Sequence, residues 1–183
     1  MASVPKSAPP GAPIGPIMQN GFVVGDLEAA VRHWSTKLGV GPFFLLEHIP
    51  FGTLYFRGQP VTFDMSVAVA QWGEMQIELI VQHDDIATIY SEFRTRHGTG
   101  LQHVGVMTSD LDADLARLKL RGIEPVQWGS TSTGIRFAYV DTDAHAGGML
   151  ELIERGPAIE AFFGMVRQAS VGWDGEKPLR RLG

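Results

Sequence analysis

The chain carries the same order of apolar and polar positions twice. The first unit starts with an apolar run from Ile17 and continues, after Asp26, with apolar residues at helical spacing up to Gly39. The second unit starts with an apolar run before Asp110 and continues with an amphipathic stretch up to Gly122. An aspartate caps the first N–H groups of a helix, and a glycine permits the left-handed turn that ends one. Each unit is therefore predicted to begin with a strand and a helix.

Short apolar segments separated by turn residues follow each of these helices. We expect strands within residues 43–50, 53–58, 61–72 and 75–82 of the first unit, and within 124–129, 135–142 and 148–154 of the second. Between the two units, residues 84–97 have the pattern of a linking helix, with Asp84 or Asp85 as its cap.

These elements divide the chain into three parts. Residues 1–16 contain five prolines among small residues and are expected to form a flexible lead-in. Residues 17–154 are expected to form a single domain, with its modules at 17–82 and 101–154. Residues 155–183 add a helix that begins at Pro157 and an irregular tail, in which Trp173 is a candidate to contact the body.

Four polar side chains stand within otherwise apolar predicted strands, at equivalent places in the two units: Gln19, Glu78, His103 and Glu151. Gln19 corresponds to His103 in the repeat, and both units close on Glu-Leu-Ile, at residues 78–80 and 151–153. Burial of a carboxylate is costly unless it is paired or bound to a metal, so a shared divalent ion explains the set. Strand alternation places Gly21 on the same strand face as Gln19, and Gly105 on the same strand face as His103. These glycines are expected to leave room beside the ligands for a substrate.

Composition narrows the class of partner. The chain has 20 acidic and 15 basic residues, a net charge of -5, with the basic residues scattered, so no nucleic-acid partner is expected. No stretch approaches the ~18 apolar residues of a membrane span, and no secretory signal is recognisable. We therefore expect a cytoplasmic protein without membrane contact. Because the chain has no cysteine, His, carboxylate or amide oxygen must hold any metal.

The repeated motifs resemble those of the vicinal oxygen chelate superfamily, which includes glyoxalase I, methylmalonyl-CoA epimerase, extradiol dioxygenases and bleomycin-resistance proteins. The resemblance spans residues 17–154. It rests on the two polar-x-Gly starts that lead to Asp-Leu (19–27 and 103–111), on the Glu-Leu-Ile ends, and on residues 141–151. The last segment resembles the family's D-P-D-G-x-x-x-E motif, with Thr142 in place of the proline.

The resemblance implies an α+β fold in which two βαβββ modules form a curved mixed sheet, a cup around a metal ion. The family's four ligand positions correspond to Gln19, Glu78, His103 and Glu151. The order Gln, Glu, His, Glu resembles glyoxalase I, whereas the dioxygenases use two His and one Glu around iron. Three oxygen donors and one imidazole suit Zn, Ni, Co or Mn.

The activity that this resemblance implies is that of a metal-dependent lyase or isomerase. Such an enzyme removes a proton α to a carbonyl of a small substrate with vicinal oxygens, and the metal stabilises the resulting enediolate. Glu151 is the first candidate for the general base, and Glu78 is the candidate for reprotonation on the opposite side. The run G-V-G-P-F-F at residues 39–44 resembles the epimerase branch, although Glu78 stands where that branch is expected to carry an amide.

The same residues are compatible with other functions. A metal-free binding protein of the bleomycin-resistance type would use the same cup without chemistry, and an extradiol dioxygenase would require iron. We expect a homodimer, and the four ligands would meet either within one chain or across the two chains.

Each polar residue also has a structural alternative. His103 alone is typical of a hydrogen-bonded core histidine, and Gln19 of a structural amide. Glu78 alone is typical of a residue that caps a hydrogen-bond network or faces solvent on an edge strand. Arg57 and Arg136 either bind a substrate anion or form surface salt bridges. The remaining histidines include three outside the predicted helices, at positions 48, 83 and 145; the first two lie near strand ends and suggest no role, and the third lies at the pocket mouth or in solvent.

Overall fold

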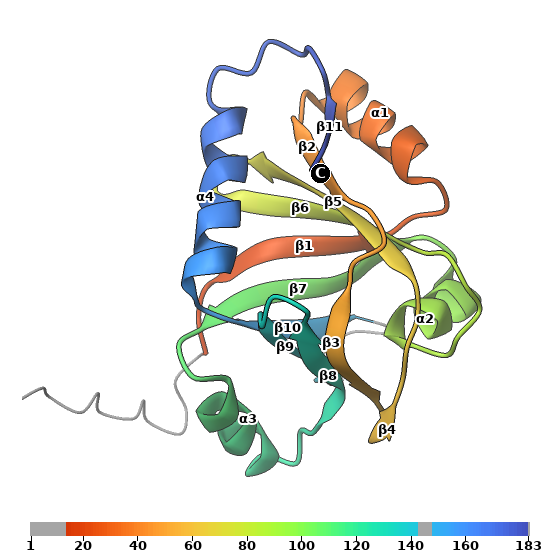
Figure 1. Ribbon diagram of the computed structural model, residues 1–183, viewed down its shortest axis with the longest axis vertical. Coiled ribbons are helices and arrows are strands. Elements are labelled where there is room, and N and C mark those ends of the chain that lie inside the picture. The colour runs from red at the N-terminus through yellow and green to blue at the C-terminus, as the bar shows by residue number, and fades with distance from the viewer. Residues whose placement is uncertain (1–13, 143–147, 183) are drawn as a thin grey trace, which may run out of the picture.

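A computed structural model describes residues 14–142 and 148–182 (Figure 1). All but the last three residues of the expected lead-in at 1–16 lie outside the described residues, as does His145.

The described chain forms one curved sheet with four helices. The strands are β1 (Ile17–Val23), β2 (Phe43–Leu46), β3 (Phe51–Phe56), β4 (Gln59–Pro60), β5 (Met65–Trp72), β6 (Met75–Gln82), β7 (Gly100–Thr108), β8 (Pro125–Thr131), β9 (Arg136–Asp141), β10 (Met149–Glu154) and β11 (Leu179–Arg181). The helices are α1 (Leu27–Leu38), α2 (Ile89–His97), α3 (Leu111–Lys119) and α4 (Pro157–Ser170). The strand order is β11-β2-β5-β6-β1-β7-β10-β9-β8-β3-β4. This is the expected α+β class.

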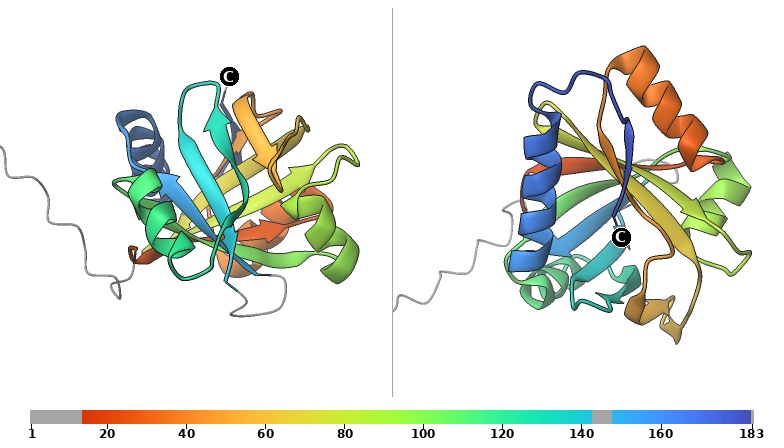
Figure 2. Two further views of the ribbon diagram at one scale, coloured as in Figure 1. Left: turned by 90° about the horizontal axis from the view of Figure 1, so that it is seen from below. Right: turned by 45° about the horizontal axis from the view of Figure 1, so that its top comes forward.

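The two units are related by a repeated strand pattern. In the first unit β1 pairs parallel with β6, and in the second β7 pairs parallel with β10. The two first strands, β1 and β7, then pair antiparallel at the centre of the sheet. The sheet curls into a cup, as the view from below shows (Figure 2). The centre of the cup is therefore built from both units of one chain.

A helix covers the outer face of each unit. Val31 of α1 packs on Ala68 and Leu79, and Leu111 of α3 belongs to the equivalent cluster around Leu152. The predicted caps are confirmed, because Asp26 accepts a hydrogen bond from Ala29 N, 2.8 Å away, and Asp110 accepts one from Ala113 N, 2.9 Å away. The end of α1 at Gly39, with φ 67°, is also as predicted. Helix α3 ends earlier than expected, at Lys119, and Gly122 lies in the turn beyond it.

The linking helix begins later than the sequence predicts. Thr88, not Asp84 or Asp85, caps α2, and its hydroxyl accepts from the backbone N–H groups of Tyr90 and Ser91. The Asp84 carboxylate instead accepts from the backbone N–H groups of Asp64 and Ile86. Because those bonds hold residue 84 in the turn after β6, the chain cannot become helical there.

One hairpin of the first unit joins the sheet of the second. β3 pairs antiparallel with β8, and β4 extends that edge. The exchange depends on a close backbone approach: a Cβ added to Gly129 would lie 2.1 Å from Thr53 O. Beside this contact the rings of Tyr55 and Trp128 stack, with centroids 5.4 Å apart and planes 12° apart. The hairpin therefore links the two modules, although its sequence lies within the first.

The C-terminal part of the chain returns to the first unit. Helix α4 runs across the strands at one side of the sheet (Figure 1), and its Val166 is fully buried in the core cluster that also contains Val69. The tail after α4 was expected to be irregular, but it forms β11, which pairs parallel with β2. Trp173 closely covers Gly41, where an added Cβ would lie 2.7 Å from the indole. This contact places Trp173 on the body of the domain.

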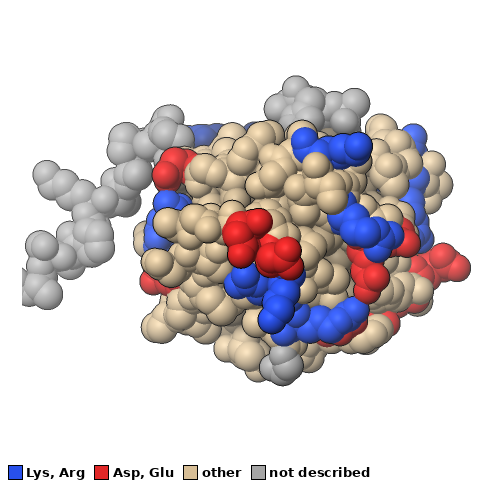
Figure 3. All heavy atoms as spheres, turned by 90° about the horizontal axis from the view of Figure 1, so that it is seen from above, with Lys and Arg blue, Asp and Glu red and all other residues tan. Residues whose placement is uncertain are grey.

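Charges of both signs intermingle on the surface. On the face shown in Figure 3, basic and acidic side chains lie next to one another. One example of such pairing is Arg181, which contacts the carboxylates of Glu28 and Glu47. Among the described residues, no helix has both the length and the apolar character needed to cross a membrane.

Candidate metal centre and its cavity

The four polar residues singled out in the sequence lie on four adjacent strands, in the order β6, β1, β7 and β10. Glu78 and Glu151 are on the outer two strands, and Gln19 and His103 are on the inner two. We refer to these residues as the central cluster. All of them come from one chain, so the cluster needs no second subunit to be complete.

The side chains of Glu78 and Glu151 converge on the imidazole of His103. Its Nε2 lies 3.3 Å from Glu78 Oε2 and 3.3 Å from Glu151 Oε2. One potential ligand atom from each of these three residues lies within 4.8 Å of the others. The His103 side chain is fully buried, and those of Glu78 and Glu151 are 15% and 8% exposed. Glu78 therefore does not project into solvent.

Two amide side chains orient the inner pair. Gln102 Oε1 lies 2.9 Å from His103 Nδ1, so Nδ1 donates to it, and in the neutral ring Nε2 carries the lone pair that faces the cluster. Gln19 Nε2 donates to Gln76 Oε1 over 3.3 Å, which leaves Gln19 Oε1 turned the other way. Both orienting residues are buried. The sequence alone did not single them out, although each is an amide within two residues of a candidate ligand in an apolar strand.

A bulge stands next to each inner ligand. The pairing of β1 with β7 skips Met18 before Gln19 and skips Gln102 before His103. Bulges re-aim the side chains beside them and are frequent near active sites. The repeat thus places the same irregularity at both inner positions.

The two glycines of the repeat serve the ligands themselves. A Cβ on Gly21 would lie 1.9 Å from His103 Cε1, and a Cβ on Gly105 would lie 2.9 Å from Gln19 Oε1. The expectation that these glycines leave room for a substrate is therefore wrong. The register pairs Gly21 with His103 and Gln19 with Gly105 across the central strands, so each glycine makes room for the ligand side chain opposite it.

The unpaired atoms of the central cluster fit a cation. Gln19 Oε1, Glu78 Oε2 and His103 Nε2 are buried and have no hydrogen-bond partner among the described residues. With Nδ1 donating to Gln102, a neutral His103 turns its lone pair toward the carboxylate oxygens, so acceptors face acceptors. Buried acceptors left in this arrangement are costly. A divalent ion with three oxygen ligands and one imidazole satisfies them together.

The pKa values of the cluster without a metal show that it favours a positive charge. Burial alone lowers the pKa of His103, but the carboxylates of Glu151 and Glu78 outweigh it and raise the pKa to about 9. Burial raises the pKa of Glu78, and the nearby negative charge of Glu151 adds to the rise. A proton on this cluster therefore takes the place that a metal ion would hold.

A cavity of about 340 Å³ opens above the central cluster. Gln19, Glu78 and Glu151 form its polar end. Most of the remaining lining is apolar, including Phe51 and Phe137 from the sheet and Phe162 from α4. Among the described residues that line it, none is Lys, Arg or His.

A pair of tyrosines borders the cluster. Tyr90 Oη donates to Tyr139 Oη over 2.8 Å, and the Tyr139 ring meets the His103 ring at 5.2 Å with the planes at 78°. Burial, followed by the negative charge of Glu151, raises the pKa of both phenols well above the usual value. Both tyrosines therefore stay neutral and act as hydrogen-bonding groups.

The two arginines considered as anion ligands lie elsewhere. Arg57 pairs with Glu92 at 2.8 Å, and Arg136 pairs with Asp112 at 2.5 Å and Glu154 at 3.3 Å. Neither arginine lines the cavity. The surface salt bridge is therefore the correct alternative for both.

The model of one protein family, the Glyoxalase/Bleomycin resistance protein/Dioxygenase superfamily, matches residues 18–139. The chain belongs to this superfamily. No curated protein matches the sequence.

Solved structures of the superfamily fold are similar to this chain at low identity. A methylmalonyl-CoA epimerase from Mycobacterium tuberculosis has a TM-score of 0.55 and 21% identity, over 79% of this chain and 91% of its own. A hypothetical protein from Bacillus halodurans C-125 has a TM-score of 0.57 and 16% identity, over 78% and 95%. A Streptomyces coelicolor methylmalonyl-CoA epimerase variant in complex with 2-nitronate-propionyl-CoA has a TM-score of 0.55 and 18% identity, over 79% and 100%. These similarities establish the fold.

Proposed function

We propose that the protein is a divalent-metal-dependent isomerase or lyase that removes a proton α to a carbonyl group. One observation carries the proposal: His103 Nε2 and the carboxylates of Glu78 and Glu151 converge in a buried place, each carboxylate with one oxygen 3.3 Å from Nε2. Methylmalonyl-CoA epimerases are among the proteins that share this fold, and their reaction is of the proposed class.

Four atoms would hold the ion: Gln19 Oε1, His103 Nε2 and one oxygen from each of Glu78 and Glu151. This donor set suits Zn, Ni, Co or Mn. When bound, the ion supplies Lewis acidity, which lowers the pKa of the α C–H and balances negative charge on the carbonyl oxygen.

We assign the proton transfers to the two carboxylates. Glu151 and Glu78 both line the cavity, and they stand on β10 and β6, the outer pair of the four central strands. A substrate between them presents one face to each. Glu151 accepts the α-proton in our assignment, and Glu78 returns a proton from the other side. Proton return to the opposite face inverts the carbon, which is the epimerase outcome.

The lining of the cavity supports a proposal for the substrate class. The polar end accepts the two adjacent oxygens, and the wall around Phe51, Phe137 and Phe162 accepts an alkyl or aryl body. Because no basic side chain lines the described cavity, an anionic body would lose its hydration without a partner. The anionic part of a thioester carrier would therefore stay outside the cavity.

Proton exchange with solvent tests the function directly. The protein is prepared without affinity nickel, loaded in turn with Zn, Ni, Co or Mn, and incubated in D2O with aryl 2-oxoaldehyde hemithioacetals or with 2-substituted acyl thioesters. We expect metal-dependent incorporation of deuterium at the α carbon, lost in His103→Ala together with one equivalent of metal. Absence of metal binding after repletion would favour a metal-free binding protein, and stoichiometric iron with oxygen consumption on catechols would favour a dioxygenase.

We also propose that the protein is a homodimer, although the central cluster is complete in one chain. Light scattering of the purified protein measures its oligomeric state. A monomer with full exchange activity would remove the dimer and leave the catalytic proposal intact.

A further inference from the structure

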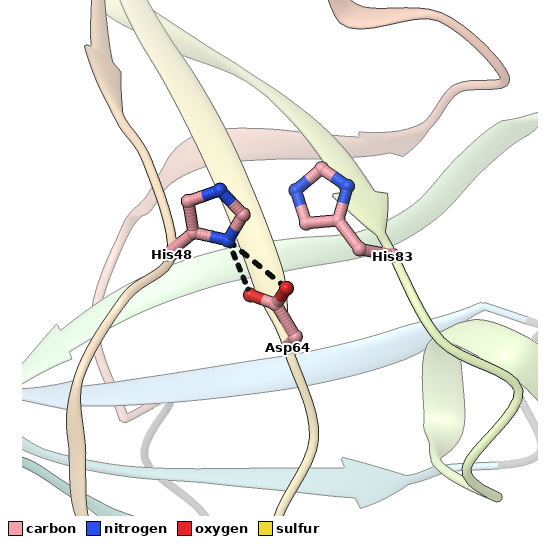
Figure 4. A group of neighbouring side chains, drawn as sticks. All are labelled: His48, Asp64 and His83. Carbon is pink, nitrogen blue, oxygen red and sulfur yellow. Dashed lines mark hydrogen bonds and ion pairs between the residues drawn. The ribbon is translucent and has the colours of Figure 1, made fainter.

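A second group of metal-ligand side chains lies at one end of the first unit. His48 follows β2, Asp64 precedes β5 and His83 follows β6 (Figure 4). The three strands are neighbours in the sheet, and each adjacent pair is antiparallel. The end of β2, the start of β5 and the end of β6 therefore meet at the same edge. We call these three residues the edge cluster.

The side chains of the edge cluster face one another. His48 Nδ1 lies 2.8 Å and 2.9 Å from the two oxygens of Asp64. The rings of His48 and His83 have centroids 5.0 Å apart and planes 38° apart. One ring nitrogen of each histidine and one oxygen of Asp64 lie within 4.8 Å of one another. Two imidazoles and a carboxylate at this spacing are a donor set for a borderline divalent ion.

The backbone around the edge cluster is held by its own hydrogen bonds. The buried Ser66 hydroxyl accepts from His48 N at 3.0 Å and lies 2.7 Å from His83 Nε2. His83 N donates to Asp64 O at 2.8 Å, and Asp64 N donates to Asp84 Oδ2 at 2.7 Å. These bonds bring the three ligand residues together before any ion binds. The entropy cost of assembling a site from them is therefore small.

The exposed side chains of the edge cluster can move close enough together to bind one ion. Bonds of about 2.0–2.2 Å to zinc require donor atoms within about 4.4 Å of one another. The His48 side chain is 66% exposed and that of Asp64 43%, so a small rotation meets this requirement. The same exposure leaves coordination positions open to water.

The edge cluster is separate from the central cluster. Met65 and Val67 of β5 point into the cavity, whereas Ser66 between them points to the opposite face, where Ala68 packs with α1. The hydrogen bonds of Ser66 therefore attach both histidines to the outer face of the sheet. None of the three edge residues lines the described cavity.

We propose that His48, Asp64 and His83 form a second divalent metal site, with a preference for Zn²⁺, Ni²⁺ or Cu²⁺. An ion there links the ends of three strands. It also holds the connection between β2 and β3. Leu46, the last residue of β2, and Ile49, within the connection, both line the cavity. An ion at this site would therefore fix the position of one wall of the cavity.

Zinc titration of the chelator-treated protein tests the site without any substrate. We expect wild-type protein to bind two equivalents of Zn²⁺. The variant His48→Ala/His83→Ala should lose one equivalent and His103→Ala the other. The matched control is His33→Ala, which removes an exposed imidazole from α1 and should keep both.

A thermal-shift measurement separates the two sites. In the His103→Ala background, Zn²⁺ should still raise Tm, and Asp64→Asn in that background should weaken zinc binding by more than about 10-fold. The proposal is overturned if His48→Ala/His83→Ala binds zinc with the stoichiometry and affinity of the wild type. It is overturned equally if His33→Ala loses as much binding, because zinc would then bind surface histidines without selection. If only the central site fails, one equivalent that depends on His48 remains.

Discussion

The imidazole of His103 occupies the space that a side chain at Gly21 would fill, because a Cβ there would lie 1.9 Å from His103 Cε1. The second unit mirrors this relationship, with Gln19 lying over Gly105. Each unit therefore supplies one inner ligand and one glycine, and the inner ligand of each unit rests on the glycine of the other. The two halves of the repeat are locked together at the point where the proposed chemistry takes place.

Gly21→Ala should displace the His103 ring and weaken metal binding by more than about 10-fold. The overlap is with a buried ring and not with the end of a flexible chain, so stability should also fall by about 1–3 kcal/mol. Zinc titration and urea unfolding measure the two effects. Gly25→Ala is the matched control, since its Cβ would come no closer than 4.0 Å to Thr99. Wild-type affinity in Gly21→Ala would contradict the interlocking arrangement.

Glu151→Gln should lower the rate of α-proton exchange by at least about 100-fold. The amide keeps an oxygen for the ion but cannot accept the proton, so metal content should fall much less than activity. Glu78→Gln is the informative companion: with a two-base epimerase it abolishes inversion but leaves exchange from one enantiomer. Deuterium incorporation into each separate enantiomer measures both variants. Full activity of Glu151→Gln would show that another group is the base.

Tyr139→Phe should destabilise the fold by about 1–3 kcal/mol, because it leaves the buried Tyr90 hydroxyl without its partner. The double variant Tyr90→Phe/Tyr139→Phe removes both polar groups and should lose less than the sum of the single variants. Urea unfolding of all four proteins completes the cycle. Strict additivity would mean that the 2.8 Å hydrogen bond does not couple the two residues.

Gly129→Ala should destabilise the protein by at least about 1–3 kcal/mol through its overlap with the backbone of β3. Its Cβ would lie 2.1 Å from Thr53 O, and the backbone there cannot move without separating β3 from β8. Gly164→Ala is the opposite control: it lies in α4 with no atom within 4 Å of an added Cβ, and alanine should stabilise the helix by about 0.5–1 kcal/mol. Thermal unfolding distinguishes the two. Equal Tm values for the two variants would show that β3 and β8 can move apart at Gly129 without loss of stability.

Local patterns account for the features that were predicted correctly. The caps at Asp26 and Asp110 are interactions between residues close in the chain, so a short window of sequence contains them. The convergence of the central cluster came from the repeat, because equivalent positions of a duplicated unit take equivalent places. The orienting roles of Gln102 and Gln76 could not be predicted from the repeat, because the hydrogen-bond partner of each amide is fixed only when the strands pair.

Sequence therefore determined the fold class, the repeat and the residues of the central cluster, because strand and helix periods and polar residues in apolar runs are written along the chain. Tertiary structure alone decided that β3 joins the second unit, that β11 pairs with β2, and that Gly21 serves His103 and not a substrate. It alone brought His48, Asp64 and His83 to one edge. Each of these depends on which strand lies beside which, and that is set by the free energy of packing the whole sheet, to which residues distant in sequence contribute together.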